Sequence, residues 1–176
     1  MSEIDAQIDG LTSSVVHRPS GRILSTRIVR VSKLTVRQKS EILSWRFDWA
    51  NEVGHPTREV MALLAESSKR FQGLTTVRDD AGFVFVNLLE SAPHNVGQNK
   101  IFSGVPGNLF AYACSRSFTL GFDGFVGFEA KSELIEHYRM SLGAEQVGSS
   151  SRMIIGNRSA LTLVKQYFKE PDQWPL

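Results

Sequence analysis

The stretch FVFVNLLESAP, residues 83–93, decides the fold that we expect for this chain. It is almost continuously apolar, which is typical of a strand buried on both faces of a central sheet. The polar stretch HNVGQNKIFS at residues 94–103 follows as a loop, and GVPGNLFAYACSRSFTLG at residues 104–121 contains the periodic apolar pattern of a helix. The sequence therefore predicts a buried central strand, a polar loop and a helix opened by glycines.

The start of this helix has the composition of an anion site. Pro106 is suited to the first helical positions, and Gly104 and Gly107 leave the neighbouring backbone N–H groups accessible. The positive end of the helix dipole adds to the attraction of these free donors for an anion. The alternative interpretation is a tight strand-to-helix corner that binds nothing. We expect the helix to run from Leu109 to Leu120 and to end at Gly121.

The bulk composition is that of an ordinary globular protein. Hydrophobic residues make up 41% and charged residues 22% of the 176 residues, which suits one domain with a substantial core. A formal net charge of +2 argues against a nucleic-acid surface. Cys114 is the only cysteine, so no internal disulfide forms, and no membrane span or signal segment is evident. We therefore expect a cytoplasmic protein that binds neither nucleic acid nor membrane.

Outside the central stretch, turn residues and apolar periodicity divide the chain into short elements. We expect strands at residues 13–17, 23–31, 71–78, 83–91 and 122–129, a hairpin within 147–155, and helices at 35–53, 57–67, 109–120, 132–142 and 157–168. Thr35 and Gln38 have the spacing of a capping box. This order predicts a single α/β (α+β) domain at residues 12–176, with a mixed, mostly antiparallel central sheet flanked by helices. Residues 1–11 are polar and aperiodic, so we expect a flexible arm there.

This order of elements resembles that of the GNAT superfamily of acyl-CoA-dependent N-acyltransferases, over roughly residues 26–168. Two segments carry the resemblance: Gly104-Val105-Pro106-Gly107-Asn108-Leu109 is similar to the family's glycine-rich pyrophosphate loop, and Tyr138 precedes Gly143-Ala144 much as a tyrosine precedes Gly-Phe in the family. Ile101 stands where the family has Arg or Gln, and Pro106 stands where it has its second glycine.

The resemblance implies a coenzyme A site, with acetyl-CoA as the cofactor. The pyrophosphate would bind at the helix start, and the pantetheine arm would pair with main chain at the end of the central strand. The implied cofactor-binding residues are Leu89, Glu90, Ser91, Ser103, Gly104, Val105, Gly107, Asn108 and Leu109. Because Pro106 has no N–H, one donor of the family's set is missing, at a cost of about 1.5–3 kcal/mol if that bond is charge-assisted.

The resemblance also implies two catalytic roles. Glu90 is the sole carboxylate in the apolar run, where partial burial favours a general base that deprotonates the amine; a solvated strand-end residue is the alternative, and Glu129 is the weaker substitute. Tyr138 matches the family's acid for the leaving thiolate. It also lies on an apolar helical stripe with Leu134 and Leu142, so a core role is the alternative.

The function implied is acetyl transfer from acetyl-CoA to an unidentified small-molecule or peptide amine, by direct attack on the thioester. The alternative is a GNAT-fold binding or interaction module without catalysis, which the departures at Ile101 and Pro106 favour. No metal site is expected, because His17, His55, His94 and His137 lack metal-ligand spacing. A homodimer is left open.

Overall fold

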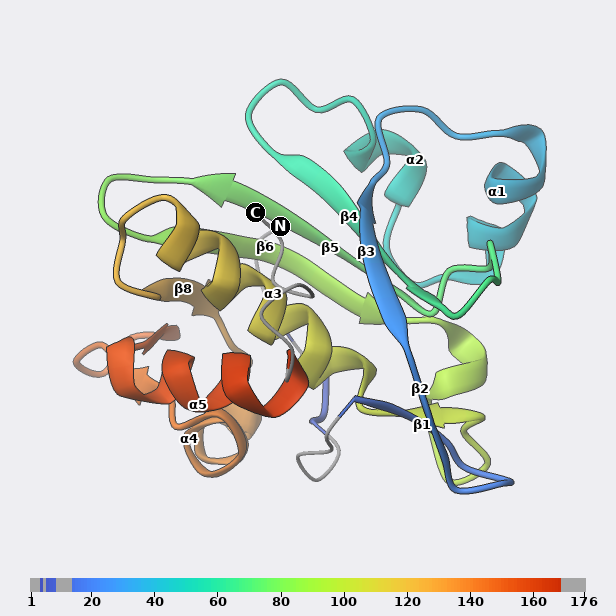
Figure 1. The fold of residues 1–176 in the computed structure, drawn as a ribbon. Helices are drawn as coiled ribbons and strands as arrows, with labels where there is room; N and C mark the ends of the chain where they lie inside the picture. The colour runs from blue at the N-terminus through green and yellow to red at the C-terminus, as the bar shows by residue number, and fades with distance from the viewer. Residues whose placement is uncertain (1–3, 5, 9–13, 169–176) are drawn as a thin grey trace.

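The computed structural model describes residues 4, 6–8 and 14–168 of the chain. A seven-stranded sheet with the order β3-β4-β5-β6-β8-β10-β9 forms its centre (Figure 1). Neighbouring strands are antiparallel except for β6 and β8, which run parallel. The strands are β3 (Thr26–Arg30), β4 (Glu59–Ala65), β5 (Gly73–Asp79), β6 (Val84–Ser91), β8 (Val126–Glu129), β10 (Arg152–Ile155) and β9 (Glu145–Gln146). The predicted mixed, mostly antiparallel sheet is confirmed.

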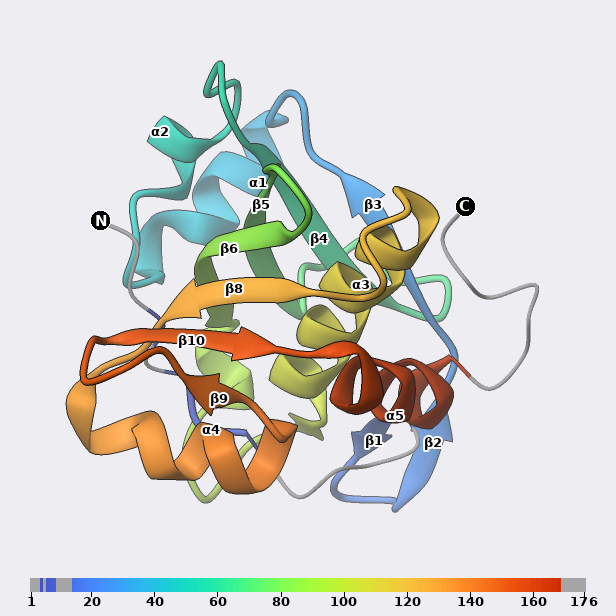
Figure 2. The same ribbon diagram turned by 90° about the vertical axis from the view of Figure 1, so that its left-hand side faces the viewer.

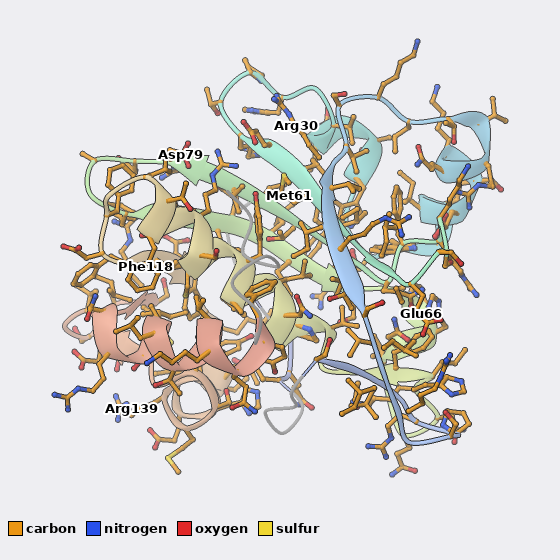
Figure 3. The ribbon with its side chains drawn as sticks, viewed as in Figure 1. Arg30, Met61, Glu66, Asp79, Phe118 and Arg139 are labelled. Atoms are coloured by element: carbon orange, nitrogen blue, oxygen red, sulfur yellow. The ribbon has the colours of Figure 1, made fainter. Side chains whose placement is uncertain are left out.

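Helices cover both faces of this sheet (Figures 1 and 2). One face carries α1 (Val36–Glu41), the 3-10 helix η1 (Ile42–Ser44) and α2 (Trp49–Glu52); the other carries α3 (Val105–Thr119), η3 (Ser132–Leu134), α4 (Ile135–Leu142) and α5 (Asn157–Tyr167). Each face has its own apolar cluster, and side chains fill the space between helices and sheet (Figure 3). None of the described helices is both long and apolar enough to span a membrane.

Strand β4 replaces the helix that we expected at residues 57–67, so that prediction is wrong. Met61 and Leu63 join the cluster under α3, whereas Val60, Ala62 and Leu64 join the cluster under α1 and α2. A strand whose two faces are both buried is apolar at consecutive positions, and over a short run this pattern cannot be distinguished from that of a helix. The two-sided burial of β4 thus explains the error.

The expected helix at residues 35–53 is present but interrupted. Thr35 and Gln38 form the predicted capping box at the start of α1. The chain leaves helical geometry after η1 and re-enters it at α2, where the side chain of Asp48 accepts a hydrogen bond from the N–H of Asn51. The interruption lies where backbone N–H groups bind a carboxylate from the sheet, as described below, and that interaction competes with helix continuation.

A second, three-stranded sheet packs at the end of the molecule where β6 terminates (Figure 1). Its strands β1 (Val15–His17) and β2 (Arg22–Leu24) form a hairpin, and β1 also pairs with β7 (Phe102–Ser103) in the loop before α3. The strand expected at residues 23–31 is divided between β2 in this sheet and β3 in the larger one. The 3-10 helix η2 (Pro93–Asn95) connects β6 to this loop.

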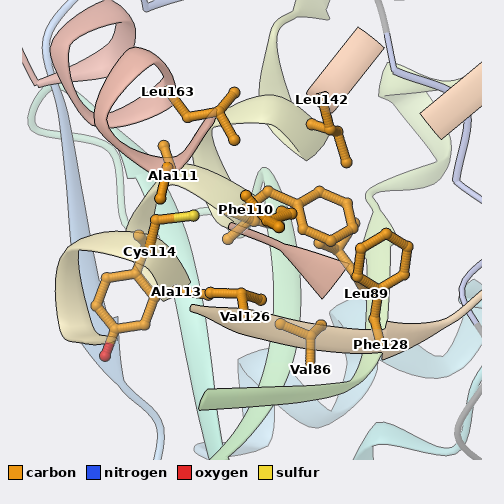
Figure 4. Packing of buried hydrophobic residues seen from close by; sticks show 14 of the residues in the cluster. Val86, Leu89, Phe110, Ala111, Ala113, Cys114, Val126, Phe128, Leu142 and Leu163 are labelled. Atoms are coloured by element: carbon orange, nitrogen blue, oxygen red, sulfur yellow. The ribbon is translucent and has the colours of Figure 1, made fainter. Parts of the chain in front are cut away.

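Helix α3 is the central element of the larger core. Its aromatic residue Phe110 lies 5.0 Å, between ring centroids, from Phe128 of β8, and both rings point into the space beside Leu89 of β6 (Figure 4). Cys114 is fully buried in the same helix, and burial raises the pKa of its thiol. Because only the thiolate is an effective nucleophile, Cys114 is a packing residue.

Candidate ligand cavity at the open end of β6

Strands β6 and β8 are paired along only part of their length. The parallel ladder joins Val84, Phe85 and Val86 to Val126, Gly127 and Phe128. Beyond this point β6 continues to Ser91 with β5 on one edge, and no other described strand pairs with its second edge. The two strands therefore diverge and leave an open strand edge at residues 88–91.

A β-bulge marks the point of divergence. The β5–β6 register pairs Thr76 with Leu88 but Val77 with Val86, so Asn87 is an extra residue on β6. A bulge bends its strand and increases the local twist, which moves the end of β6 away from β8. Asn87 is buried, and its Oδ1 atom has no hydrogen-bond partner among the described residues. An asparagine inside an otherwise apolar run was the sequence signal for this bulge, and it was missed.

A cavity of about 760 Å³ lies at the open end of β6. Its walls come from β6, the loop after η1, the loop between β6 and α3, the first turn of α3 and the N-terminal segment. The lining residues are Ala6, Gln7, Ser44, Arg46, Leu89, Glu90, Ser91, Pro93, Asn95, Val96, Gly97, Lys100 and Pro106. Its volume lies within the range of about 300–1,000 Å³ that is usual for small-molecule sites.

The three cofactor-binding residues predicted on β6, Leu89, Glu90 and Ser91, all line this cavity. The carboxylate of Glu90 accepts three N–H bonds: Oε1 from the backbone N–H of Arg46 at 2.6 Å, and Oε2 from that of Phe47 at 3.2 Å and from Nε1 of Trp49 at 2.7 Å. Glu90 thus fixes the loop between η1 and α2 against the end of the sheet. A carboxylate has about four acceptor positions, so one position remains for a ligand.

The predicted pyrophosphate loop lies beside the cavity, and most of it is buried. Gly104 caps α3 with a φ of 89°, and Ser103 is held in β7 by pairing with Val16. The other predicted residues of the loop, Val105, Gly107, Asn108 and Leu109, are buried in the first turns of α3. At the start of α3 the residue that lines the cavity is Pro106, and proline has no N–H to donate. Binding of the pyrophosphate by the backbone N–H groups of this loop stays a prediction.

Gly107 is required for helix packing. A Cβ atom at this position would lie 2.0 Å from the hydroxyl oxygen of Tyr167 on α5. The glycine therefore permits the close approach of α3 and α5, and a bulky substitution would separate these helices. A bulky residue at position 107 would therefore affect the packing of the two helices as well as any ligand bound at the start of α3.

Tyr138 is fully buried on α4, and its ring packs against Phe128 at a centroid distance of 5.4 Å. Its hydroxyl donates to the backbone carbonyl of Ala6 at 2.6 Å, and burial raises the pKa of the phenol. The phenol is not among the lining groups of the cavity. This is the geometry of the core alternative; the role of general acid stays a prediction.

The N-terminal segment contributes the least expected part of the site. Of the predicted flexible arm, residues 1–3, 5 and 9–11 lie outside the described residues. Ile4 and Ile8 are buried, and Ala6 and Gln7 line the cavity. At these four residues the prediction of a flexible arm is wrong, because isoleucines at positions 4 and 8 enter the main core from a segment too short to show periodicity.

Side chains of the polar loop hold the opposite wall in place. Gln72 accepts hydrogen bonds at Oε1 from Nε2 of His94 (2.9 Å) and from Nδ2 of Asn95 (3.0 Å). Asn95 in turn accepts from the backbone N–H of Phe102 at 3.1 Å. His94 therefore supports the turn after β6. Arg46 and Lys100 supply positive charge to the cavity lining, and sequence reasoning did not identify Arg46.

No known protein-family model matches the chain, and no curated protein matches its sequence. Among solved structures, it is similar to an acetyltransferase of Bacillus subtilis in complex with CoA (12% identity, 74% of this chain, 95% of the other, TM-score 0.45). It is also similar to a protein of Exiguobacterium sp. 255-15 assigned as an acetyltransferase (13% identity, 79% of this chain, 98% of the other, TM-score 0.48). A third similar structure is that of a protein of Bacillus anthracis assigned as a streptothricin acetyltransferase, in complex with acetyl coenzyme A (10% identity, 75% of this chain, 81% of the other, TM-score 0.42).

Proposed function

We propose that this chain is a GNAT-type acetyltransferase that binds acetyl-CoA in the cavity at the open end of β6. One observation carries the proposal. After the bulge at Asn87, β6 presents an edge at residues 88–91 that no described strand occupies, beside a cavity of about 760 Å³. An extended ligand with alternating amide donors and acceptors, such as the pantetheine arm of coenzyme A, is complementary to a free strand edge.

The charge of the lining fits the same ligand. Arg46 and Lys100 lie on the cavity wall, where cations attract the phosphates of a nucleotide ligand. The helix dipole at the start of α3 adds to this attraction, although the buried loop limits direct access to its N–H groups. We therefore expect the pantetheine arm to supply more of the affinity than phosphate contacts at the loop.

The reaction that we propose is direct transfer to an amine. The amine nitrogen attacks the thioester carbonyl, a C–N bond forms, the C–S bond breaks, and coenzyme A leaves as a thiolate that takes a proton. Glu90 is the proposed base, because its carboxylate faces the cavity and keeps one acceptor position for the amine. The loop from Ser44 to Arg46, on the same wall, is the proposed contact for the acceptor, a small-molecule or peptide amine.

Titration calorimetry tests cofactor binding. The full chain is titrated with coenzyme A, acetyl-CoA and, as a matched control, ADP, which carries the pyrophosphate but no pantetheine arm. We expect heat from the first two ligands and much weaker binding of ADP. Absence of heat with coenzyme A at millimolar concentration would refute the proposal, and equal affinity for ADP would refute the pairing of pantetheine with β6.

Glu90→Gln tests the proposed base once an acceptor is found by measuring release of the free thiol. General-base catalysis commonly contributes about 10²–10⁴-fold, so kcat should fall into that range. The matched control is Trp49→Phe, which removes one of the three N–H donors to Glu90 and keeps the carboxylate. Equal losses of kcat in both variants would show that Glu90 acts by holding the loop.

A further inference from the structure

The N-terminal segment, described at residues 4 and 6–8, contacts the central sheet beside the cavity. The backbone N–H of Ile4 donates to the carbonyl of Glu129 at 2.6 Å, and the N–H of Lys131 donates to the carbonyl of Ile4 at 3.3 Å. These bonds form a parallel bridge between Ile4 and Ala130, directly after β8. The segment is therefore joined to the continuation of β8 by one β-bridge at Ile4.

Two further hydrogen bonds from α4 fix the segment. The hydroxyl of Tyr138 donates to the carbonyl of Ala6 at 2.6 Å, and Nε2 of His137 accepts from the N–H of Ile8 at 2.6 Å. Ile4 is fully buried and Ile8 is nearly so, whereas Gln7 is exposed to the cavity. Burial on one side and cavity lining on the other make the segment a partition between the core and the cavity.

The segment occupies the edge of β8 that faces β6. The opposite edge pairs with β10, and the chain after β8 continues that contact through the N–H of Ala130, which donates to the carbonyl of Ser151. The parallel ladder to β6 ends at Phe128, and the bridge to Ile4 follows it on the remaining edge. The space between the diverging strands is thus bounded by β6 on one side and by the N-terminal segment on the other.

The cavity persists with the segment in place. Ala6 and Gln7 line the same cavity of about 760 Å³ as Leu89, Glu90 and Ser91. A segment that blocked the site would fill the space between the strands. Here it lines that space and leaves the edge of β6 accessible.

We propose that residues 4 and 6–8 form part of the acyl-CoA site, so that the pantetheine arm lies between β6 and this segment. The inference rests on the function proposed above and adds to it that the docked segment and the ligand stabilise each other. Gln7 is the residue of the segment that contacts the ligand, through its amide group. Undocking of the segment would remove one wall and lower the fraction of protein competent to bind.

The first test compares two isoleucines with equal burial. Ile4 and Ile155 are both fully buried, but Ile155 lies on β10 away from the cavity lining. Ile4→Ala and Ile155→Ala should both lower the melting temperature. Calorimetry with coenzyme A should show an affinity about tenfold weaker for Ile4→Ala, because the docked fraction falls, and an unchanged affinity for Ile155→Ala. Equal affinities in the two variants would overturn the proposal.

Gln7→Ala keeps the proposal testable if Ile4→Ala does not fold, because Gln7 is exposed and its loss leaves the core intact. We expect its affinity for coenzyme A to fall several-fold. An unchanged affinity would overturn the contact, and a tighter affinity in either variant would show that the segment competes with the ligand.

Hydrogen exchange supplies an independent measurement. Coenzyme A should slow exchange of the amides of Ile4 and Ile8, which are bonded to Glu129 and His137. Faster exchange on ligand addition would mean displacement of the segment and would overturn the proposal. If the unchanged protein binds no coenzyme A, the proposed function falls and this inference with it. If it binds but the Ile4, Gln7 and exchange results are negative, only this inference falls.

Discussion

The two halves of β6 contrast within one strand. From Val84 to Val86 it lies between β5 and β8, with hydrogen-bonded neighbours on both edges; from Leu88 to Ser91 it keeps β5 alone as a described neighbour. Asn87, the bulged residue, separates the halves. The first half is apolar and lies in the core, whereas the second half ends in two polar residues, Glu90 and Ser91, and borders a cavity. The difference shows that the edge of a buried strand becomes available to a ligand where the pairing with a neighbouring strand ends.

The paired half should be sensitive to loss of packing. Phe128→Ala removes a fully buried ring that packs against Phe110 and Tyr138 next to the last β6–β8 pair. We expect the free energy of unfolding to fall by about 3–5 kcal/mol, measured by urea denaturation. Phe125→Ala, at a ring that is 39% exposed, is the control and should cost less than about 0.5 kcal/mol. A small effect of Phe128→Ala would contradict the role of the paired half.

A change behind the cavity wall beside the open half should lower stability by less. Tyr138→Phe removes the hydrogen bond to Ala6 and keeps the ring, so stability should fall by about 1 kcal/mol. Because the hydroxyl proton is donated to Ala6, we expect kcat to stay near that of the unchanged protein. A fall in kcat of about 10²–10⁴-fold would instead establish Tyr138 as the general acid.

The smallest expected effect concerns pH and the loop that closes the open half. Partial burial, with a smaller contribution from the positive charge of Arg70, lowers the pKa of His94 below its ordinary value. The unfolded chain therefore binds a proton more readily than the folded one at this residue, and stability rises with pH. The contribution is complete above the unfolded pKa of about 6.5 and is lost progressively below it.

Replacement of the histidine isolates this contribution. In His94→Gln, the difference between urea midpoints measured at acidic and at neutral pH should be smaller than in the unchanged protein. An equal difference would assign the acid sensitivity to other groups.

Much of the fold was predictable because its signals are local. The capping box at Thr35 and Gln38, the turn between β5 and β6, and the C-cap of α4 at Gly143 all appear where the sequence indicated them. Strand β4 was not predictable, because burial on both faces removes the alternation that identifies a strand. The burial of β4 on both faces arises from helices on the two sides of the sheet, and these pack against it only in the folded chain.

The site was predictable only in part, because some of its residues are brought together by contacts between distant parts of the chain. Leu89, Glu90 and Ser91 were identified through the resemblance, which implies that the pantetheine arm pairs with the end of the central strand, and these residues line the cavity. The contribution of Ala6 was not identified, since the bond that holds it to Tyr138 joins residues 132 positions apart. Such a contact leaves no periodic pattern in either segment.

The three N–H bonds to Glu90 have a consequence for engineering of this chain. Two of the donors, at Arg46 and Phe47, belong to the backbone, so a substitution at either position keeps these two N–H groups available to Glu90. Proline is the exception at both positions, because it has no N–H. Trp49 donates through its side chain, so its replacement removes a donor. Variants of this loop should therefore omit proline at positions 46 and 47 and leave residues 49 and 90 unchanged.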